Sequence, residues 1–151
     1  MRWFDMRWFD RAGQMLQSIL RSSNLRVPMA ISLGAIAGAL SRYFLSATMN
    51  QGLGTVFPFA TFLINLSGAL LMGFFTSFAV NRRIISPDVR LIVAVGFLGS
   101  YTTFSTYTLD LEKLLAIGNW QLTALYWIGS TLLGLLCLEL GGYVARRLPL
   151  D

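Results

Sequence analysis

The sequence predicts an all-α membrane protein with four transmembrane helices, the third of which is broken. Of the 151 residues, 55% are hydrophobic and only 13% are charged, whereas an ordinary soluble domain has about 25% charged residues. Most of the hydrophobic residues lie in four long segments, and most of the charged residues lie outside them. A helix that crosses the bilayer core needs about 20 mostly apolar residues, and each segment is long enough.

The four segments form one predicted membrane domain, residues 27–147. Gln51–Gly54 and Gly118–Asn119 predict turns between spans, because glycine and asparagine favour turn conformations. Since these connections are short, we expect consecutive helices to be antiparallel neighbours. The predicted spans are Val27–Met49, Phe57–Val80, Val89–Leu109 and Leu122–Val144.

Residues 1–26 precede the first span and have a different pattern. Trp8, Ala12, Met15 and Ile19 recur at helical spacing with arginines nearby. Apolar residues on one face and basic residues around them are typical of a helix that lies in the headgroup layer. We therefore predict an amphipathic N-terminal segment rather than a cleaved signal peptide.

The basic residues predict the orientation of the chain. With four spans, both termini and the loop between the second and third spans lie on one side of the membrane. Lys113 follows the third span on the other side, and Arg42 lies within the first span. Basic residues mark cytoplasmic segments, so we predict that both termini are cytoplasmic. The residues on the predicted cytoplasmic side are Arg2, Arg7, Arg11, Arg21, Arg26, Arg82, Arg83, Arg90, Arg146 and Arg147.

The composition excludes several kinds of chemistry and predicts that the protein is not an enzyme. The sequence has no histidine and a single cysteine, Cys137, so it has neither a histidine-based triad nor a zinc knuckle. It also lacks a glycine-rich loop that binds phosphates. The formal net charge of +5 fits cytoplasmic flanks of membrane spans, and we expect no nucleic acid partner.

Two features of the first span have structural and functional interpretations. Gly34 and Gly38 form a G-x-x-x-G pattern, which lets two helix backbones approach closely. This pattern fits packing within the chain and equally a subunit interface. Arg42 either extends to the outer interface or is a fixed positive charge in a vestibule that attracts anions.

Asn65 lies in the middle of the second span, between leucines and an isoleucine. An amide at bilayer depth needs hydrogen-bond partners, because leaving it unpaired costs about 2 kcal/mol or more. Two interpretations stay open: a hydrogen bond to another helix, or an NH₂ group that faces a polar pathway.

The third span has the most informative composition. Five of the nine residues from Gly99 to Tyr107 are serine or threonine, and the segment also contains Gly96. A helix that breaks near Gly99–Thr103 explains this composition, since glycine permits unwinding and hydroxyls satisfy the freed backbone groups. Broken helices at the middle of the membrane bind ions.

Aromatic and hydroxyl side chains follow the predicted break. Phe104 and Tyr107 share one helix face, as do Tyr126 and Ser130 in the fourth span. Core packing and interhelical hydrogen bonds explain these pairs, and so does a pore, because the edge of an aromatic ring carries positive potential. No acidic residue is predicted near the centre of any span, which favours a small anion over a proton-coupled substrate.

The sequence resembles the Fluc fluoride channels, also called CrcB. The resemblance rests on GFLGSYTTFSTY (Gly96–Tyr107) and is supported by Gly38–Tyr43, Asn65–Gly68 and the pair Tyr126/Ser130. It covers about residues 27–147. It implies a broken third helix and an antiparallel, dual-topology-type dimer with two narrow fluoride pathways and a central structural sodium ion.

The resemblance also implies roles for individual residues. Backbone carbonyls of Gly99 and Thr102 would hold the sodium ion. Tyr107 stands where the family usually has phenylalanine. The charge bias of this chain leaves two assemblies open, an antiparallel homodimer and a heterodimer with a sibling subunit of opposite bias. The predicted fluoride pathway consists of Asn65, Phe104, Tyr107, Ser130, Tyr126, Thr103 and Arg42.

The predicted function is a fluoride-selective channel in a bacterial plasma membrane, surrounded by lipid. It would export cytoplasmic fluoride by passive electrodiffusion and so relieve fluoride toxicity. The alternatives are a small multidrug-type four-helix antiporter and a membrane scaffold protein without a pathway. The antiporter class needs a glutamate in its first span, and Val27–Met49 has no acidic residue.

Overall fold

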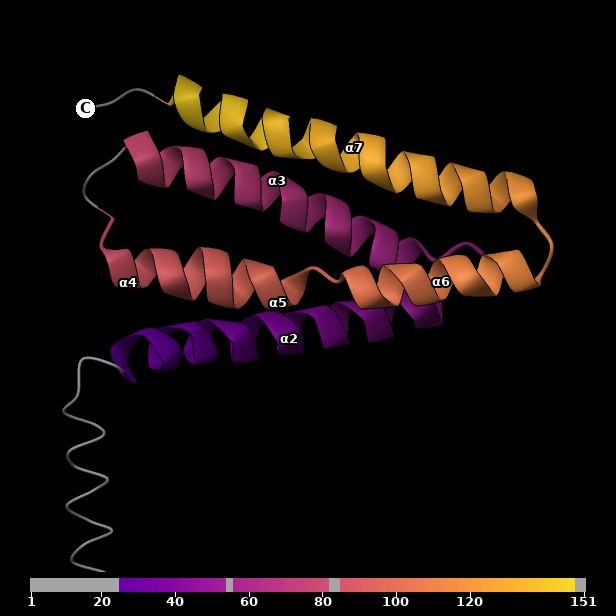
Figure 1. The fold of residues 1–151 in the computed structure, drawn as a ribbon, viewed down its shortest axis with the longest axis horizontal. Coiled ribbons are helices and arrows are strands. Elements are labelled where there is room, and N and C mark those ends of the chain that lie inside the picture. Colours follow the sequence, from indigo (N-terminus) through magenta and orange to yellow (C-terminus); the bar gives the residue numbers. More distant parts are fainter. Residues whose placement is uncertain (1–24, 54–55, 82–84, 149–151) are drawn as a thin grey trace, which may run out of the picture.

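The structure, a computed structural model, describes residues 25–53, 56–81 and 85–148, and the predicted amphipathic segment therefore lies almost wholly outside the described residues. This part of the chain contains four helical spans that are long and apolar enough to cross a membrane, as predicted. The third is interrupted between α5 and α6 (Figure 1). The elements are α2 (Arg26–Leu53), α3 (Phe59–Asn81), α4 (Pro87–Arg90), η2 (Leu91–Leu98), α5 (Gly99–Tyr101), α6 (Phe104–Ala116) and α7 (Trp120–Arg147).

The helices extend further than the apolar pattern predicts. The helix α2 continues to Leu53, so Gln51–Leu53 are helical where the sequence predicts a turn. The third span runs from Pro87 to Ala116 and includes charged residues that we expected to follow it. Helices often continue past the bilayer core into the interfacial region, and hydropathy alone does not mark where they end.

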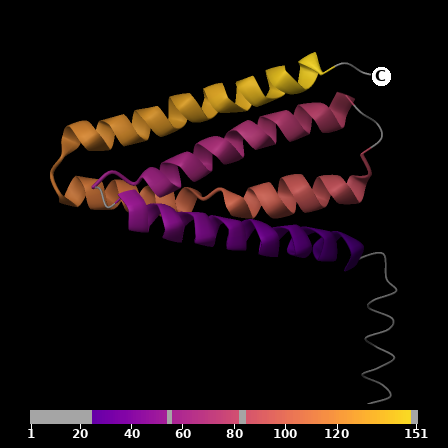
Figure 2. The same ribbon diagram turned by 180° about the vertical axis from the view of Figure 1, so that it is seen from behind.

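The expected neighbours are in contact, but they are not the most extensively packed pairs. Consecutive spans run in opposite directions, but the most extensive packing joins α2 to η2 and α3 to α7. The members of each pair run in the same direction, as Figures 1 and 2 show from opposite sides. Consecutive spans are thus antiparallel neighbours, as expected, and the two parallel pairs pack more extensively than they do.

Glycines explain the pairing of α2 with the third span. A Cβ atom on Gly34 would meet the backbone carbonyl oxygen of Ile92, and one on Gly38 would meet that of Phe97. Across the same contact, a Cβ atom on Gly96 would meet the backbone of Ile31 and Gly34. The small-residue pattern of the first span thus serves close backbone packing inside the chain.

The pairing of α3 with α7 has the same origin. A Cβ atom on Gly73 would meet the backbone of Leu138, and one on Gly141 would meet the carbonyl oxygen of Leu70.

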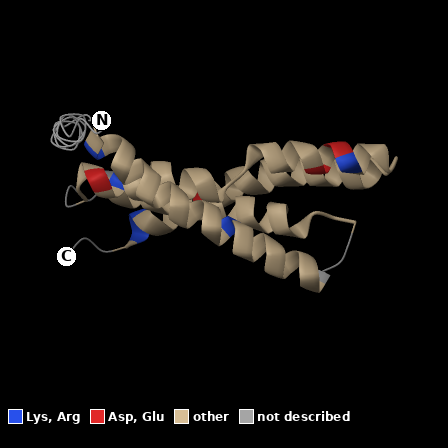
Figure 3. Cartoon of the chain, turned by 90° about the horizontal axis from the view of Figure 1, so that it is seen from below, with Lys and Arg blue, Asp and Glu red and all other residues tan. Residues whose placement is uncertain are grey.

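Figure 3 shows that most charged residues lie towards the two ends of the bundle. The first residues of α2 and the last residues of α7 share one end (Figure 1).

At that end, charged side chains connect three of the spans. The Arg26 guanidinium bonds the carboxylate of Asp88, with a distance of 2.9 Å between Nε and Oδ2. Arg90 donates from Nη2 to the carbonyl oxygen of Ala79 at 2.6 Å. Ser86 caps α4, since its hydroxyl accepts a hydrogen bond from the backbone N–H of Val89. These contacts fix the start of the third span.

Candidate functional site

The third span is broken at Thr102 and Thr103, within the predicted interval. Both residues have extended backbone conformations, with φ −76° and ψ 159° at Thr102 and φ −149° and ψ 122° at Thr103. The physical reason that we gave is wrong in part, because Gly99 is helical, with φ −65° and ψ −29°. The break begins three residues later and does not use the freedom of glycine.

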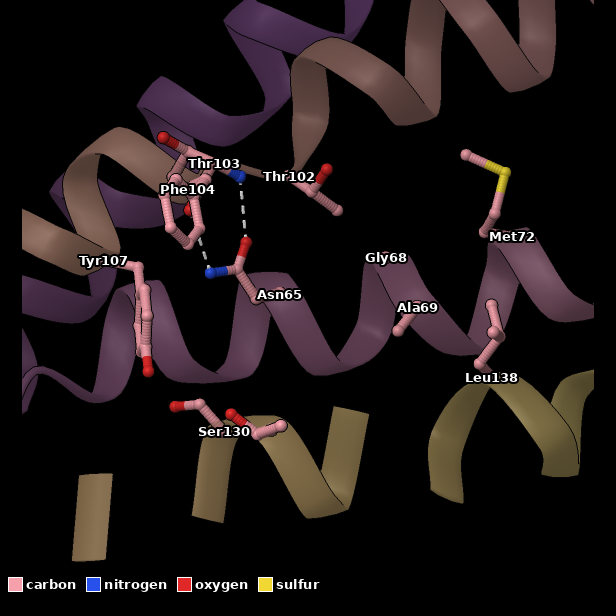
Figure 4. Close-up of a pocket in the computed structure, with 11 residues that line it drawn as sticks. Asn65, Gly68, Ala69, Met72, Thr102, Thr103, Phe104, Tyr107, Ser130 and Leu138 are labelled. Carbon is pink, nitrogen blue, oxygen red and sulfur yellow. Dashed lines mark hydrogen bonds between the residues drawn. The ribbon is translucent and has the colours of Figure 1, made fainter. Parts of the chain in front are cut away.

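Asn65 replaces the hydrogen bond that the Thr103 N–H loses at the break and adds a second one to the Thr103 carbonyl. Its Nδ2 donates to the carbonyl oxygen of Thr103 at 3.1 Å, and its Oδ1 accepts from the Thr103 N–H at 2.9 Å (Figure 4). The hydroxyl of Thr103 then caps α6 by accepting from the N–H of Thr106 at 3.2 Å. Of the two interpretations of Asn65, the structure supports the hydrogen bond to another helix.

A hollow of about 410 Å³ opens beside the break. It brings together most of the predicted pathway residues from α3, α6 and α7, and Figure 4 shows Phe104, Tyr107 and Ser130 around it. Among the residues that the structure describes, no acidic or basic side chain lines it. The described residues that line it are Asn65, Gly68, Ala69, Met72, Thr102, Thr103, Phe104, Tyr107, Ser130, Thr131 and Leu138.

The two aromatic rings lie side by side at the start of α6. The centroids of Phe104 and Tyr107 are 5.9 Å apart, and the ring planes are inclined by 39°. Phe104 is 77% exposed in the single chain, so its ring edge is available to a neighbouring group. The hydroxyl of Tyr107 points to α7 and lies 3.5 Å from the carbonyl oxygen of Trp127, which makes a weak hydrogen bond at most.

The predicted residues of α7 separate into two environments. Ser130 lines the hollow, whereas Tyr126 does not and is completely buried. The ring of Tyr126 packs against Tyr107, with centroids 5.2 Å apart, and against Phe57 at 5.4 Å. Among the described residues, neither the Ser130 hydroxyl nor that of Tyr126 has a hydrogen-bond partner. Ser130 therefore retains a free hydroxyl at the wall of the hollow.

Arg42 lies in a separate hollow of about 230 Å³ between α2, α3 and the break. Its Nε is buried and has no hydrogen-bond partner among the described residues, an arrangement that favours an anion nearby. Thr103 lines both hollows. The other residues around Arg42 are Ala39, Tyr43, Ser46, Thr61, Ile64 and Thr106.

Asp110 is a residue near the pathway whose position the sequence reasoning missed. We expected it to follow the third span, but it lies inside α6, and its side chain is only 12% exposed. Its carboxylate accepts a hydrogen bond of 2.7 Å from the Thr61 hydroxyl and lies 3.8 Å from Nζ of Lys113. The spacing from Tyr107 to Asp110, almost one helical turn, was the available signal.

The backbone at the break fits a small hard cation. In an unbroken helix, the N–H of Thr103 would donate to the carbonyl oxygen of Gly99, but here it donates to Asn65. The extended ψ of Thr102 turns its carbonyl away from the helical direction. Carbonyl oxygens of a broken helix are ligands that Na⁺ accepts, so the residues present are compatible with the predicted sodium site.

Known proteins resemble most of this chain. The family described as "CrcB-like protein, Camphor Resistance (CrcB)" matches residues 29–142. A protein of Trichormus variabilis named "Fluoride-specific ion channel FluC" is 50% identical over 129 residues, which are 85% of this chain and 94% of that protein.

Two further relatives have the same name. The protein of Synechococcus sp. is 51% identical over 83% of this chain and 96% of its own length. That of Synechocystis sp. is 47% identical over 85% of this chain and 98% of its own length. The family predicted from the third-span motif is confirmed: the chain belongs to the CrcB-like family of multi-pass membrane proteins.

Proposed function

We propose that this protein is a fluoride-selective channel subunit that lets cytoplasmic fluoride leave the cell by passive electrodiffusion. The observation that carries the proposal is the hollow at the break, which combines two aromatic rings with hydroxyls and, in the part of the chain that the structure describes, has no charged side chain in its wall. The relatives named "Fluoride-specific ion channel FluC" support it. The protein would catalyse no reaction.

The chemistry of the hollow suits a small anion that has lost part of its water. A dry site must replace the lost hydration with fixed donors and dipoles. The edges of Phe104 and Tyr107 offer positive potential, the free hydroxyl of Ser130 offers a hydrogen bond, and the N-terminus of α6 adds backbone N–H groups. A carboxylate here would repel the ion. The hollow around Arg42 would attract anions to the entrance.

The direction of flow follows from acid–base chemistry. Fluoride enters cells as neutral HF, which crosses the bilayer and dissociates in the more alkaline cytoplasm. The anion accumulates there because it does not cross lipid. A selective pore in the plasma membrane therefore exports fluoride without an energy source, and relief of fluoride toxicity follows.

The proposed assembly is an antiparallel dimer. Phe104 is 77% exposed in the single chain although it borders the hollow, and a second subunit would cover it and close the pathway. A structural sodium ion would be held at the centre of the dimer by the carbonyls of Gly99 and Thr102. Its positive charge would balance the partial negative charge of these carbonyl oxygens.

The orientation of the chain in the membrane distinguishes an antiparallel homodimer from a heterodimer with a sibling subunit. A homodimer needs the chain to insert both ways, whereas a heterodimer accepts the single orientation, with cytoplasmic termini, that the charge bias favours. A protease site placed after Asp151 and digested from outside intact cells measures the orientation. Cleavage of about half of the chains supports the homodimer, and complete protection supports a sibling subunit of opposite orientation.

Efflux from liposomes tests the proposed function. Purified protein should release fluoride from liposomes at a rate far above that of protein-free vesicles, and it should leave chloride inside. Samples prepared with choline in place of sodium should lose thermal stability if the sodium site is structural. Equal release of chloride and fluoride would contradict the proposal, as would the absence of release by monodisperse protein.

Two alternatives are less well supported. A multidrug-type antiporter needs a carboxylate in its first span, and α2 contains no acidic residue. A scaffold protein without a pathway does not require a broken third span or the unpaired hydroxyl of Ser130. Membership of the CrcB-like family supports the channel over both.

A further inference from the structure

Asn65 holds the interrupted backbone of the third span with both ends of its side-chain amide. The two hydrogen bonds to Thr103, of 2.9 and 3.1 Å, join residues that are 38 positions apart in the sequence. Figure 4 shows the amide of Asn65 facing the backbone of Thr103 from α3. The side chain thus replaces the carbonyl that would accept from the Thr103 N–H in a continuous helix, and it adds a donor to the Thr103 carbonyl.

This replacement is needed because the break lies at bilayer depth. An unbroken helix would pair the N–H of Thr103 with Gly99 and its carbonyl with Tyr107. The break removes the first of these partners, whereas the carbonyl of Thr103, as the N-cap of α6, still accepts the first bond of that helix. Lipid offers no water for the N–H that is left. A carboxamide carries both a donor and an acceptor, and the neighbours Ile64 and Leu66 carry neither.

Other hydroxyls near the break are occupied elsewhere. Ser100 Oγ donates to the carbonyl oxygen of Ala35 at 2.9 Å or to that of Gly96 at 2.7 Å. Thr102 Oγ1 donates to the carbonyl oxygen of Leu98 at 3.1 Å. Within the part of the chain that the structure describes, Asn65 is the side chain that bonds the backbone of Thr103.

We propose that Asn65 is a positioning residue that keeps the Thr102–Thr103 step extended and thereby sets where α6 begins. Thr103 is the N-cap of α6, and its hydroxyl accepts from the N–H of Thr106. Because Phe104 is the first residue of α6, the place of the cap determines the place of its ring. The proposal rests on the proposed channel function, and it assigns Asn65 to the backbone rather than to the ion.

We call the two hydrogen bonds between Asn65 and Thr103 the clamp. Hydrogen exchange tests the clamp without any measurement of transport. In Asn65→Leu, which keeps the size of the side chain and removes both polar groups, the Thr103 amide should exchange about tenfold faster or more, as expected when a protecting hydrogen bond is lost. The measurement is made by NMR in detergent without fluoride. Asn119→Leu is the matched control, since Asn119 also accepts a backbone hydrogen bond, from Leu122 at 3.0 Å, but lies in the turn before α7, away from the break. It should leave exchange at Thr103 unchanged.

A backbone substitution tests the role of the clamp in conduction. Replacing Thr103 with its α-hydroxy acid turns its N–H into an ester oxygen and leaves Asn65 intact. The clamp predicts that this ester lowers fluoride efflux about tenfold and that Asn65→Leu has a smaller effect in the ester than in the wild type, because the ester has already removed one of the two hydrogen bonds that Asn65→Leu breaks. If Asn65 acted as a ligand of the ion, or if the ester acted by weakening the Thr102 carbonyl, the two effects would add.

The outcomes separate the clamp from the channel function. Unchanged Thr103 exchange in folded Asn65→Leu would overturn the clamp, as would additive losses of efflux. If Asn65→Leu does not fold, the ester alone decides, and unchanged efflux overturns the proposal. If the wild-type protein conducts no fluoride, the channel function fails while the exchange result still tests the hydrogen bonds.

Discussion

Phe104→Ile should abolish most of the fluoride efflux while the protein stays folded. Isoleucine has similar volume, but its C–H groups carry little of the positive potential of a ring edge. An ion that loses this partner in a dry passage meets a barrier higher by about 3 kcal/mol, which lowers the rate about 100-fold. The measurement is efflux from liposomes, with size-exclusion chromatography as a test of folding.

Phe44→Ile is the control for this substitution. Phe44 is 62% exposed, close to the exposure of Phe104, but lies on α2 and does not line the hollow beside the break. It should leave efflux unchanged. Undiminished fluoride efflux in folded Phe104→Ile would show that the ring does not border the ion path.

Gly141→Ala should strongly destabilise the membrane domain. The added Cβ would meet the carbonyl oxygen of Leu70 and, at 2.7 Å, the backbone nitrogen of Phe74. Backbone atoms cannot rotate away as side chains do, so α3 and α7 must separate. We expect a loss of stability of about 3 kcal/mol, measured as a lower midpoint of thermal unfolding in detergent.

Gly134→Ala lies on the same helix and provides the comparison. A Cβ atom at Gly134 would meet nothing within 4 Å, so this variant should unfold at the wild-type temperature or slightly above it, since alanine favours helix. Equal stability of the two variants would mean that α3 and α7 are not in backbone contact.

The class and the spans follow from the sequence because both depend on local composition. About 20 apolar residues in a row are sufficient to specify a spanning helix. The exact place of the break is different in kind, because it depends on Asn65, which lies 38 positions before Thr103. The serines and threonines indicate a weak helix, and the partner from α3 selects the residue at which it opens.

Parts of the fold and of the site could not be read from periodicity. The π-helical stretch Leu91–Leu98 has the same apolar composition as an α-helix, and its packing against α2 is a tertiary effect. The prediction placed Tyr126 and Ser130 together on one helix face, but one is a core residue beneath Tyr107 and the other borders the hollow. Only the depth of burial distinguishes them.

The two parallel helix pairs have a mechanical consequence. Backbone contacts at Gly34 and Gly141 leave no flexible side chains between the partners, so each pair resists sliding. Thermal motion is then concentrated at the seam between the pairs, which the amide of Asn65 crosses to reach Thr103. The break in the third span therefore lies on the more compliant joint of the subunit, which the Asn65 amide, the Thr61–Asp110 bond and the Arg90–Ala79 bond cross.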